Sequence, residues 1–362
     1  MKYHIEQGSE KHAYMQLYEQ LREDIVAGVL PCGKKLPSKR LLAEETGSSV
    51  VTVEHAYAIL CDEGYIESRE RSGYFVIYRE DDFPAGAESA AVSVRRVEHS
   101  KRLSSVSSEF PFSVLSKTMR RVLSEYGEEI LIKSPNHGCV ELREAITAYL
   151  ERSNGMKVRA EQIVIGAGAE YLYSLIVQLL DMERVALERP SYGKIEQVYS
   201  ANGVQCELLE LGGDGIKTAE LERSQAAVLH ITPFNSFPSG ITASASKRME
   251  YLRWARRRGG YIIEDNYDSE LTVSKKNEDT VYSLCEDGRV IYLNTFSKTI
   301  APSMRIGYMV LPESLLASFR EKLDFYSCTV PVFEQYVLAE LISNGDFERH
   351  INRVRRARRK AK

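Results

Sequence analysis

Short apolar runs alternate with helical patterns between about residues 140 and 311, and this alternation constrains the fold more than any other feature. Each run has four to six residues, too few for a buried helix, and lacks the polar alternation of a half-exposed strand. Such runs are typical of strands that are buried on both faces of a parallel sheet. They occupy residues 162–165, 185–188, 227–231, 261–264, 290–293 and 306–311, and helical patterns cover residues 141–152, 170–180 and 244–258. We therefore predict an α/β fold with a mostly parallel sheet covered on both faces.

Two of these runs end in residues that can do chemistry. Asp265 and Tyr267 follow one run, and Lys298 follows another, seven residues before Arg305. Ligands of parallel sheets bind at the carboxyl ends of strands, so we expect these side chains to share one site. A lysine in this setting suits a Schiff base with pyridoxal phosphate, and a carboxylate can keep the pyridine nitrogen of that cofactor protonated. Taken singly, the lysine is as easily a solvated surface residue, and Asp265 a helix N-cap.

The amino-terminal residues follow a different pattern. Tyr14, Leu17, Tyr18, Leu21 and Ile25 recur at helical spacing before Gly28, which predicts a first helix. Ser38 can cap a second helix that ends near Thr46, and Ser48 or Ser49 can cap a third helix. Runs at 66–69 and 74–77 with a turn between them predict a two-stranded wing. This order is typical of an α+β winged helix-turn-helix domain.

These two regions together resemble the MocR-type regulators, in which a GntR-type winged helix-turn-helix is fused to an aminotransferase-like domain. The resemblance is found in the sequences of residues 295–308 and residues 12–78. It implies the fold-type-I aminotransferase architecture, with pyridoxal 5'-phosphate bound at Lys298. It also implies roles for other residues: Asp265 at the ring nitrogen, Tyr267 at the 3-oxygen, Tyr192 on the ring face, and Arg305, Ala169, Glu170, Thr295 and Ser297 around the phosphate.

Three parts of this implied site are open to other interpretations. The glycine-rich segment at 166–170 follows a strand and opens a helix, so it can hold a phosphate, but it is equally a plain turn. Tyr192 is alternatively a core tyrosine. Asn235 and Ser236 stand where related regulators usually have His-Gln, and Phe237 stands where aminotransferases have Asn, so a direct polar contact from this turn to the cofactor is in doubt.

Residues 1–78 carry nine Lys/Arg against twelve Asp/Glu, so the first domain is not basic overall. Its contacts with DNA must therefore come from local clusters of basic residues. The family's arginine at the start of the third helix is replaced by Val50, which can make only apolar contacts. A solvated charged face is the alternative interpretation, but the clusters fall where phosphate contacts are expected. The candidate DNA-binding residues are Lys34, Lys35, Ser38, Lys39, Arg40, Ser49, Thr52, Arg69 and Arg71.

We expect four segments along the chain. They are a DNA-binding domain at 1–78, a flexible linker at 79–108, a pyridoxal-phosphate-binding domain at 109–348 and a basic tail at 349–362. The tail has eight Lys/Arg and no acid, so it is either a solvated, frayed segment or a contributor to nucleic-acid affinity. The sequence stops before any match to the family's small domain, which supplies the arginine that clamps a substrate carboxylate. We therefore expect sensing of a ligand rather than sustained catalysis.

Composition excludes several other classes. The chain is 43% hydrophobic and 27% charged, with no apolar run of membrane-spanning length and no signal peptide, so we expect a cytoplasmic protein. Six scattered cysteines indicate neither a metal site nor a disulfide framework. The prediction is a DNA-binding transcription regulator, acting as a homodimer, that senses an amine or amino acid through its cofactor. The alternative is an active class I aminotransferase with a vestigial DNA-binding head.

Overall fold

The computed structural model describes residues 3–6, 11–69, 72–79, 110–267, 269–271 and 279–361. Contacts divide the chain into two compact units, Met1–Lys101 and Arg102–Lys362. We call them the head and the body, and each is described by itself. The linker predicted at 79–108 lies outside the described residues, except for Arg79. Among the described helices, none is long and apolar enough to cross a membrane.

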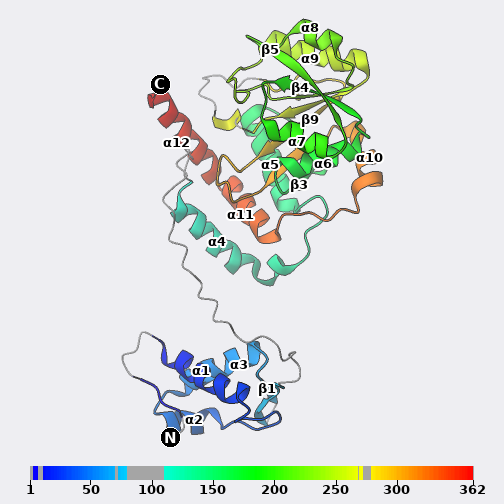
Figure 1. The fold of residues 1–362 in the computed structure, drawn as a ribbon. Helices are drawn as coiled ribbons and strands as arrows, with labels where there is room; N and C mark the ends of the chain where they lie inside the picture. The colour runs from blue at the N-terminus through cyan, green and yellow to red at the C-terminus, as the bar shows by residue number, and fades with distance from the viewer. Residues whose placement is uncertain are drawn as a thin grey trace. The chain divides into compact units, whose positions relative to one another are not determined.

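The head is a three-helix unit with a two-stranded wing (Figure 1). Its elements are α1 (Ala13–Val26), α2 (Lys39–Thr46), α3 (Val50–Asp62), β1 (Ile66–Arg69) and β2 (Gly73–Val76). The side chain of Ser38 accepts a hydrogen bond from the N–H of Leu41 and that of Ser49 from the N–H of Thr52, so both serines cap the helices that follow them. The predicted winged helix-turn-helix is confirmed.

A glycine turn joins α2 to α3, and α3 packs into the head's core. Gly47 ends α2 in the left-handed conformation, with φ 64°, which the turn into α3 requires. The stripe predicted for α3, Val53, Ala56, Tyr57 and Leu60, is completely buried. Val50 and Val51, at the start of α3, are exposed. This end of α3 is therefore available for contact outside the head.

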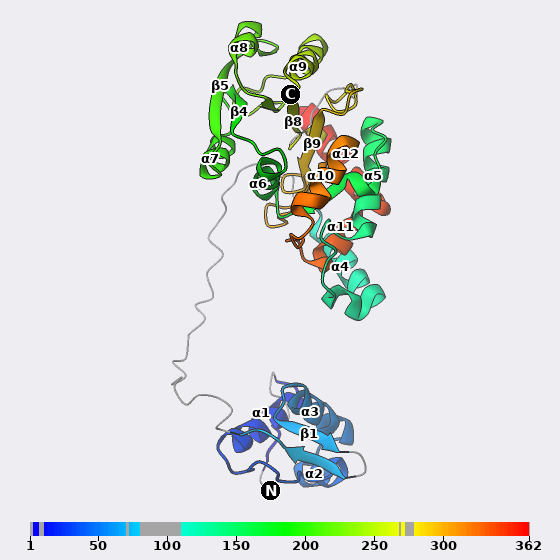
Figure 2. The ribbon, with the colours of Figure 1, turned by 90° about the vertical axis from the view of Figure 1, so that its right-hand side faces the viewer.

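The body is built on an eight-stranded sheet with the order β3-β10-β9-β8-β7-β4-β5-β6. Figure 2 shows this sheet with β4, β5, β8 and β9 labelled. Strands β9, β8, β7, β4 and β5 pair in parallel, whereas β10 is antiparallel to both of its neighbours. The mostly parallel sheet is therefore confirmed. The strands are β3 (Ile163–Gly166), β4 (Arg184–Arg189), β5 (Gln205–Gly212), β6 (Gly215–Ile216), β7 (Val228–Ile231), β8 (Tyr261–Asp265), β9 (Val290–Thr295) and β10 (Gly307–Val310).

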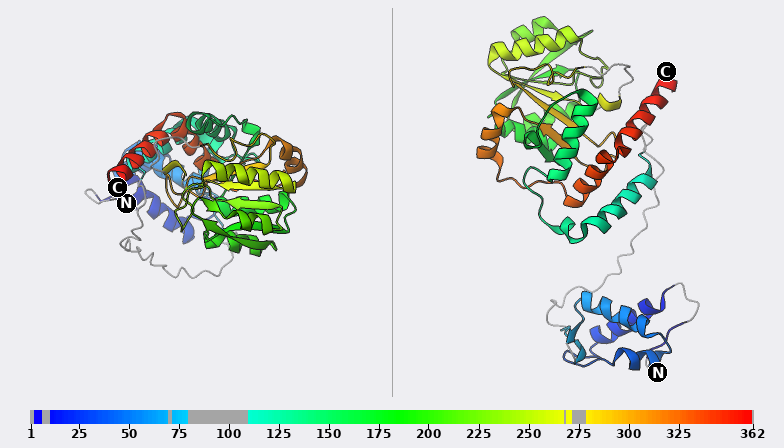
Figure 3. Two further views of the ribbon diagram at one scale, coloured as in Figure 1. Left: turned by 90° about the horizontal axis from the view of Figure 1, so that it is seen from above. Right: turned by 180° about the vertical axis from the view of Figure 1, so that it is seen from behind.

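Helices cover both faces of this sheet (Figure 3). One face packs against α6 (Ala169–Leu179), α7 (Gly193–Ala201) and α10 (Glu313–Leu323). The other face is covered by α5 (Val140–Asn154), α8 (Thr218–Arg223), α9 (Ala245–Arg258), α11 (Val332–Ser343) and α12 (Asp346–Ala361), and α4 (Phe112–Tyr126) packs on α11. Short 3-10 turns are η2 (Gly127–Leu131), η3 (Ala160–Gln162) and η4 (Ser269–Leu271). Successive strand residues serve opposite cores: Met309 faces one, while Tyr308 and Val310 face the other.

The predicted boundary between residues 348 and 349 falls inside α12, so the basic segment is not a separate frayed tail. Phe347 and Ile351 are buried in the same core as α11. Arg355 Nε donates to the carbonyl of Glu270 at 2.5 Å, and Arg358 donates to that of Leu271 at 3.1 Å. The segment is helical and attached because one side of it is apolar and two of its arginines find backbone acceptors. Sequence reasoning weighed only its charge.

Candidate functional site

The strand register brings the predicted site residues to one edge of the sheet. Gly307 of β10 pairs with Gly166 of β3 on one side and with Thr295 of β9 on the other. Asp265 of β8 pairs with Leu293 of β9, two residues before Thr295. The segment that follows β3, the segment that follows β9 and the end of β8 are therefore neighbours. This arrangement is the one expected for a ligand site at the ends of parallel strands.

Asp265 is a buried carboxylate with one occupied oxygen and one vacant oxygen. It is 2% exposed. The hydroxyl of Tyr173 donates a short hydrogen bond to Oδ2, and Nε2 of His230 lies 3.7 Å from the same oxygen. Among the described residues, no donor reaches Oδ1. A buried carboxylate oxygen without a donor is costly, so Oδ1 is suited to a ligand that brings an N–H or O–H group.

Lys298 lies in the turn after β9, and its side chain is exposed. Its Nζ is 4.1 Å from the centre of the Tyr267 ring, which is within the range of a cation–π contact. The hydroxyl of Tyr267 donates to the carbonyl of Asn235 at 3.4 Å. The predicted lysine and phenol are thus adjacent, and the amine is accessible from solvent.

The amino terminus of α6 forms the cationic part of the site. Gly168 precedes the helix with φ 88° and ψ 175° and has no side chain with which to cap it. The guanidinium of Arg305 is so close that a Cβ at Gly168 would lie 3.0 Å from its Nη2. Unpaired N–H groups at a helix start, next to a guanidinium, are suited to a phosphate.

Glu170 adds a negative charge to this corner, which the sequence pattern did not reveal. Its Oε2 lies 2.9 Å from Arg305 Nη2, and its Oε1 lies 3.3 Å from Lys194 Nζ. The Glu170 carboxylate is therefore paired with the same guanidinium that would bind a phosphate. A contact from Glu170 to a phosphate must come from its backbone N–H, and its side chain would have to give way.

The other predicted residues surround this centre at different depths. Thr295 is buried, and the hydroxyl of Ser297 donates to the carbonyl of Met304 at 3.2 Å. Tyr192 is 45% exposed and meets Phe237 edge to face, with 6.2 Å between the ring centres. Tyr192 is therefore no core residue, and the core interpretation of it is wrong. Its exposed ring is available to stack on a ligand.

Sequence reasoning missed a set of buried polar residues behind Asp265. Besides Tyr173 and His230, this set includes Tyr199, Glu188 and Ser236. The hydroxyl of Ser236 donates to Glu188 Oε2 at 2.6 Å. Burial raises the pKa of Glu188 to about 7, although the bond from Ser236 acts in the opposite direction. Tyrosines at core positions of a helix carry no sign of a polar role, so only the position of Glu188 at a strand end could have suggested one.

The chemical groups of these residues match those of pyridoxal phosphate. The accessible amine of Lys298 can condense with an aldehyde, and Oδ1 of Asp265 lacks the donor that a protonated pyridine nitrogen would supply. Tyr267 offers a phenol, and the corner formed by Gly168 and Arg305 offers N–H groups and positive charge. The donor set therefore matches an aldehyde, a basic ring nitrogen and a phosphate on one molecule.

In the head, the predicted DNA-binding residues lie near α2, the start of α3 and the wing. Lys39 Nζ is paired with Glu54 at 2.5 Å, and Arg69 is paired with Glu67 at 2.6 Å and lies over the ring of Phe75. No carboxylate of the described residues pairs with the remaining basic side chains, Lys34, Lys35 and Arg40, all of which are exposed. The exposed Ser38 and Ser49 use their hydroxyls as helix caps, and Thr52 shares a hydrogen bond with Ser49. Arg71 lies outside the described residues.

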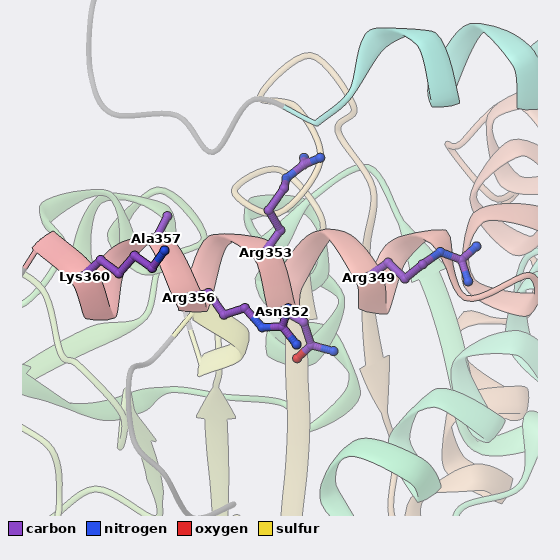
Figure 4. Close-up of a pocket in the computed structure, with 6 residues that line it drawn as sticks. All are labelled: Arg349, Asn352, Arg353, Arg356, Ala357 and Lys360. Atoms are coloured by element: carbon purple, nitrogen blue, oxygen red, sulfur yellow. The ribbon is translucent and has the colours of Figure 1, made fainter.

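A second basic surface runs along α12 (Figure 4). It borders a cavity of about 440 Å³ lined by Arg349, Asn352, Arg353, Arg356, Ala357 and Lys360. Two of its arginines are engaged inside the helix: Arg349 with Asp346 at 2.7 Å, and Arg353 with His350 at 2.7 Å. None of the residues that line this cavity belongs to the candidate cofactor site around Asp265 and Lys298.

Two family descriptions match the chain. The description "Bacterial regulatory proteins, gntR family" covers residues 13–76, and "Aminotransferase class I and II" covers residues 107–362. The matches coincide with the head and with the body. The second match covers more than half of the chain.

The chain is similar to named regulators and to a solved aminotransferase structure. The chain is 36% identical to the HTH-type transcriptional regulator YdeL of Bacillus subtilis over 96% of this chain and 77% of that protein. It is 29% identical to the probable rhizopine catabolism regulatory protein MocR of Rhizobium meliloti, over 95% of this chain and 74% of that protein. A solved structure of kynurenine aminotransferase from Pyrococcus horikoshii, in complex with PMP, is similar with a TM-score of 0.62 and 26% identity, covering 77% of this chain and 73% of that one.

Proposed function

Because the chain belongs to the HTH-type regulators that join a gntR-family head to an aminotransferase body, it is a DNA-binding transcription regulator, and we propose that its body binds pyridoxal 5'-phosphate to sense an amine or amino acid. The body has the fold of class I aminotransferases. The observation that supports cofactor binding most directly is Oδ1 of Asp265, a buried acceptor that no described donor satisfies. The relatives favour regulation over the alternative of an aminotransferase with a vestigial head.

In this proposal each side chain has one task. Lys298 would attach the cofactor covalently through Nζ, Asp265 would accept from the ring nitrogen, and Tyr267 would donate to the 3-oxygen. The N–H groups of Ala169 and Glu170 and the guanidinium of Arg305 would hold the phosphate, with the hydroxyls of Thr295 and Ser297 as further phosphate contacts and Tyr192 on the ring face. When bound, the cofactor supplies an aldehyde carbon that exchanges amines and a ring that withdraws electrons.

Sensing follows from the accessibility of Lys298. Its amine is exposed, so an incoming amine can displace it without opening a buried core. With the cofactor bound, exchange for an incoming amine would leave the Lys298 side chain unattached, and its contact with Tyr267 would hold it beside that ring. The change in charge and position at this turn is the signal that distinguishes the liganded state from the unliganded one.

We further propose that the head binds operator DNA mainly through phosphates, with Lys34, Lys35 and Arg40 as the principal contacts. These three cations are exposed and without a carboxylate partner among the described residues, whereas Lys39 and Arg69 must first leave Glu54 and Glu67. The regulator acts as a homodimer in the cytoplasm, where bacterial DNA lies. Exposed apolar side chains on the body, including Phe112 at 77%, Leu131 at 81% and Ile132 at 64%, support burial of this surface against a second copy.

The cofactor proposal is tested by the visible absorption spectrum of the purified chain with added pyridoxal phosphate, before and after borohydride. Wild type should gain a chromophore that borohydride fixes to Lys298. Lys298→Ala should lose the fixed adduct, whereas Lys157→Ala, which removes an exposed lysine elsewhere on the body, should keep it. An adduct that maps to another lysine would contradict the assignment.

The sensing proposal is tested with a panel of amines and amino acids plus a keto-acid acceptor. We expect at least one compound to shift the spectrum and to change the affinity for operator DNA. Many turnovers per subunit, lost in Lys298→Ala and without any effect on DNA binding, would instead support the aminotransferase alternative.

DNA binding through phosphates is tested by the salt dependence of affinity. Each phosphate contact contributes roughly 0.9 to the slope of log affinity against log salt, so Arg40→Gln should reduce the slope by about that amount on every sequence. Arg257→Gln, which removes the same charge from α9 of the body, serves as the matched control. A change in preference at a single base pair with an unchanged slope would refute the assignment of Arg40 to phosphate.

A further inference from the structure

Asp265 is held from behind by a compact cluster of three aromatic side chains from three different elements. Tyr173 of α6, Tyr199 of α7 and His230 of β7 are 4%, 0% and 2% exposed. The rings pack directly on one another: the centres of Tyr173 and His230 are 5.1 Å apart, and those of Tyr199 and His230 are 5.6 Å apart, both edge to face. Such packing leaves the polar atoms of the cluster little freedom to reorient.

We propose that Tyr173 and His230 are positioning residues that hold Asp265 by its Oδ2, so that Oδ1 alone faces the ring nitrogen of the bound cofactor. This inference rests on the proposed cofactor site. The geometry that supports it is the convergence of the Tyr173 hydroxyl and the His230 Nε2 on one oxygen, while the other oxygen has no described donor.

The positions of the protons follow from burial. Burial raises the pKa of the Tyr199 phenol well above its usual value, and burial with the charge of Asp265 does the same for Tyr173, so both hydroxyls keep their protons and can donate. The hydroxyl of Tyr199 lies 2.8 Å from Nδ1 of His230. If it donates to Nδ1, the neutral imidazole carries its proton on Nε2, the nitrogen that faces Asp265.

The hydrogen bond from Tyr173 and the nearby imidazole of His230 act on Oδ2 and thereby on Oδ1. Hydrogen bonds and positive polarity directed at a carboxylate stabilise its charged form and make it a weaker base. At 3.7 Å the imidazole acts through its polarity rather than through a hydrogen bond, so Tyr173 provides the larger share. A weaker base leaves the proton on the ring nitrogen, which is the form that withdraws electrons from the aldehyde carbon.

Glu188 of β4 also faces this group, as does Glu170 on the side of Tyr173, and the charge of Glu188 disfavours a second negative charge nearby. The pKa of Glu188, which burial raises to about 7, means that this acid gains or loses its proton near neutrality. The hydrogen bond from Tyr173 to Oδ2 keeps the Asp265 carboxylate oriented beside this acid. Ser236 keeps Glu188 oriented through its 2.6 Å hydrogen bond.

If the cluster only stabilised the fold, its variants would behave differently from variants of a positioning cluster. Loss of the Tyr173 hydroxyl would then lower the stability of the body and leave the bound cofactor unchanged. A positioning role predicts changes in the cofactor's affinity and in the pH titration of its visible band, even where the fold is intact. The two roles are therefore distinguished by measurements other than activity.

The experiment compares Tyr173→Phe and His230→Gln with wild type in the full chain, using pyridoxal phosphate as the probe. Tyr282→Phe is the matched control, because it removes a largely buried hydroxyl that contacts Gln162 and not Asp265. Tyr173→Phe should raise the half-saturating concentration roughly tenfold, by analogy with the effect of outer hydrogen-bond partners at metal sites. It should also raise the midpoint of the chromophore's pH titration, since a ring without its proton makes the linkage at Lys298 more basic. His230→Gln should act in the same direction with a smaller effect.

A double-mutant cycle with Asp265→Asn provides the sharpest test. If Tyr173 acts through Asp265, Tyr173→Phe should cause no further shift of the midpoint once the carboxylate is gone. The inference is overturned if the shift persists in that background, or if both single variants match wild type within twofold in affinity while Asp265→Asn does not. A wild-type chain that takes up no cofactor would overturn the proposed function itself, and the inference with it.

Discussion

Gly168→Ala is expected to damage the cofactor site through the backbone and through Arg305 together. Gly168 has φ 88° and ψ 175°, a region that is essentially restricted to glycine and that costs other residues on the order of 1–3 kcal/mol. Alanine also restricts the unfolded chain, which offsets roughly 0.4–1 kcal/mol of this loss. We therefore expect a net destabilisation of about 1–2 kcal/mol, or a fall in the melting temperature of roughly 2–8 °C for a body of this size.

The effect on the cofactor has a separate origin. A Cβ at residue 168 would lie 3.0 Å from Nη2 of Arg305, tighter than most real contacts of this kind, so the guanidinium must shift slightly. Because this shift weakens a charged contact to the phosphate, we expect the half-saturating concentration of pyridoxal phosphate to rise by up to about tenfold. Thermal melting without cofactor measures the first effect, and absorbance titration measures the second.

Gly155→Ala is the matched control for this prediction. Gly155 ends α5 with φ 65° and ψ 13°, and a Cβ there would meet nothing within 4 Å. Its substitution should cost about 1 kcal/mol from the left-handed backbone alone, without a change in cofactor affinity. Equal affinities of the two variants for pyridoxal phosphate would refute the placement of the phosphate at Gly168 and Arg305.

Three further predictions follow from single side chains. Glu170→Gln should lower the half-saturating concentration of pyridoxal phosphate, because it removes the carboxylate that pairs with Arg305 at 2.9 Å; a weaker affinity would show that the carboxylate helps to hold the cofactor. Burial, assisted by Arg353, lowers the pKa of His350 to about 4, so its contribution to stability is full at pH 7 and is lost as the pH falls below about 6.5. Urea denaturation should thus show wild type losing about 2 kcal/mol more than His350→Gln between pH 7 and pH 5, and parallel losses would contradict this. Ser49→Ala removes the cap of α3 and should cost the head about 1 kcal/mol in the same assay, whereas an unchanged head would mean that the 3.1 Å bond to Thr52 is not needed.

The local elements were predictable because their signals are local. Apolar runs identified the strands that carry Asp265 and Thr295, and the serine caps and Gly47 identified the helices of the head. The short strand β6 and the more polar strand β5 were missed, since neither has a continuous apolar run. The resemblance to regulators with an aminotransferase body added the roles of Lys298 and Arg305, and the family comparisons confirm that resemblance.

What the sequence alone determined is which segments become strands and helices, and that Asp265 and Lys298 lie at strand ends. Only the tertiary structure decided what surrounds them. Tyr173 is 92 residues from Asp265, and Glu170 is 135 residues from Arg305, so no spacing rule links these pairs. The antiparallel insertion of β10 between β3 and β9 aligns Gly166, Gly307 and Thr295. The physical reason is general: periodicity reports which face of an element is buried, whereas a site is formed by side chains that meet only after several elements have packed.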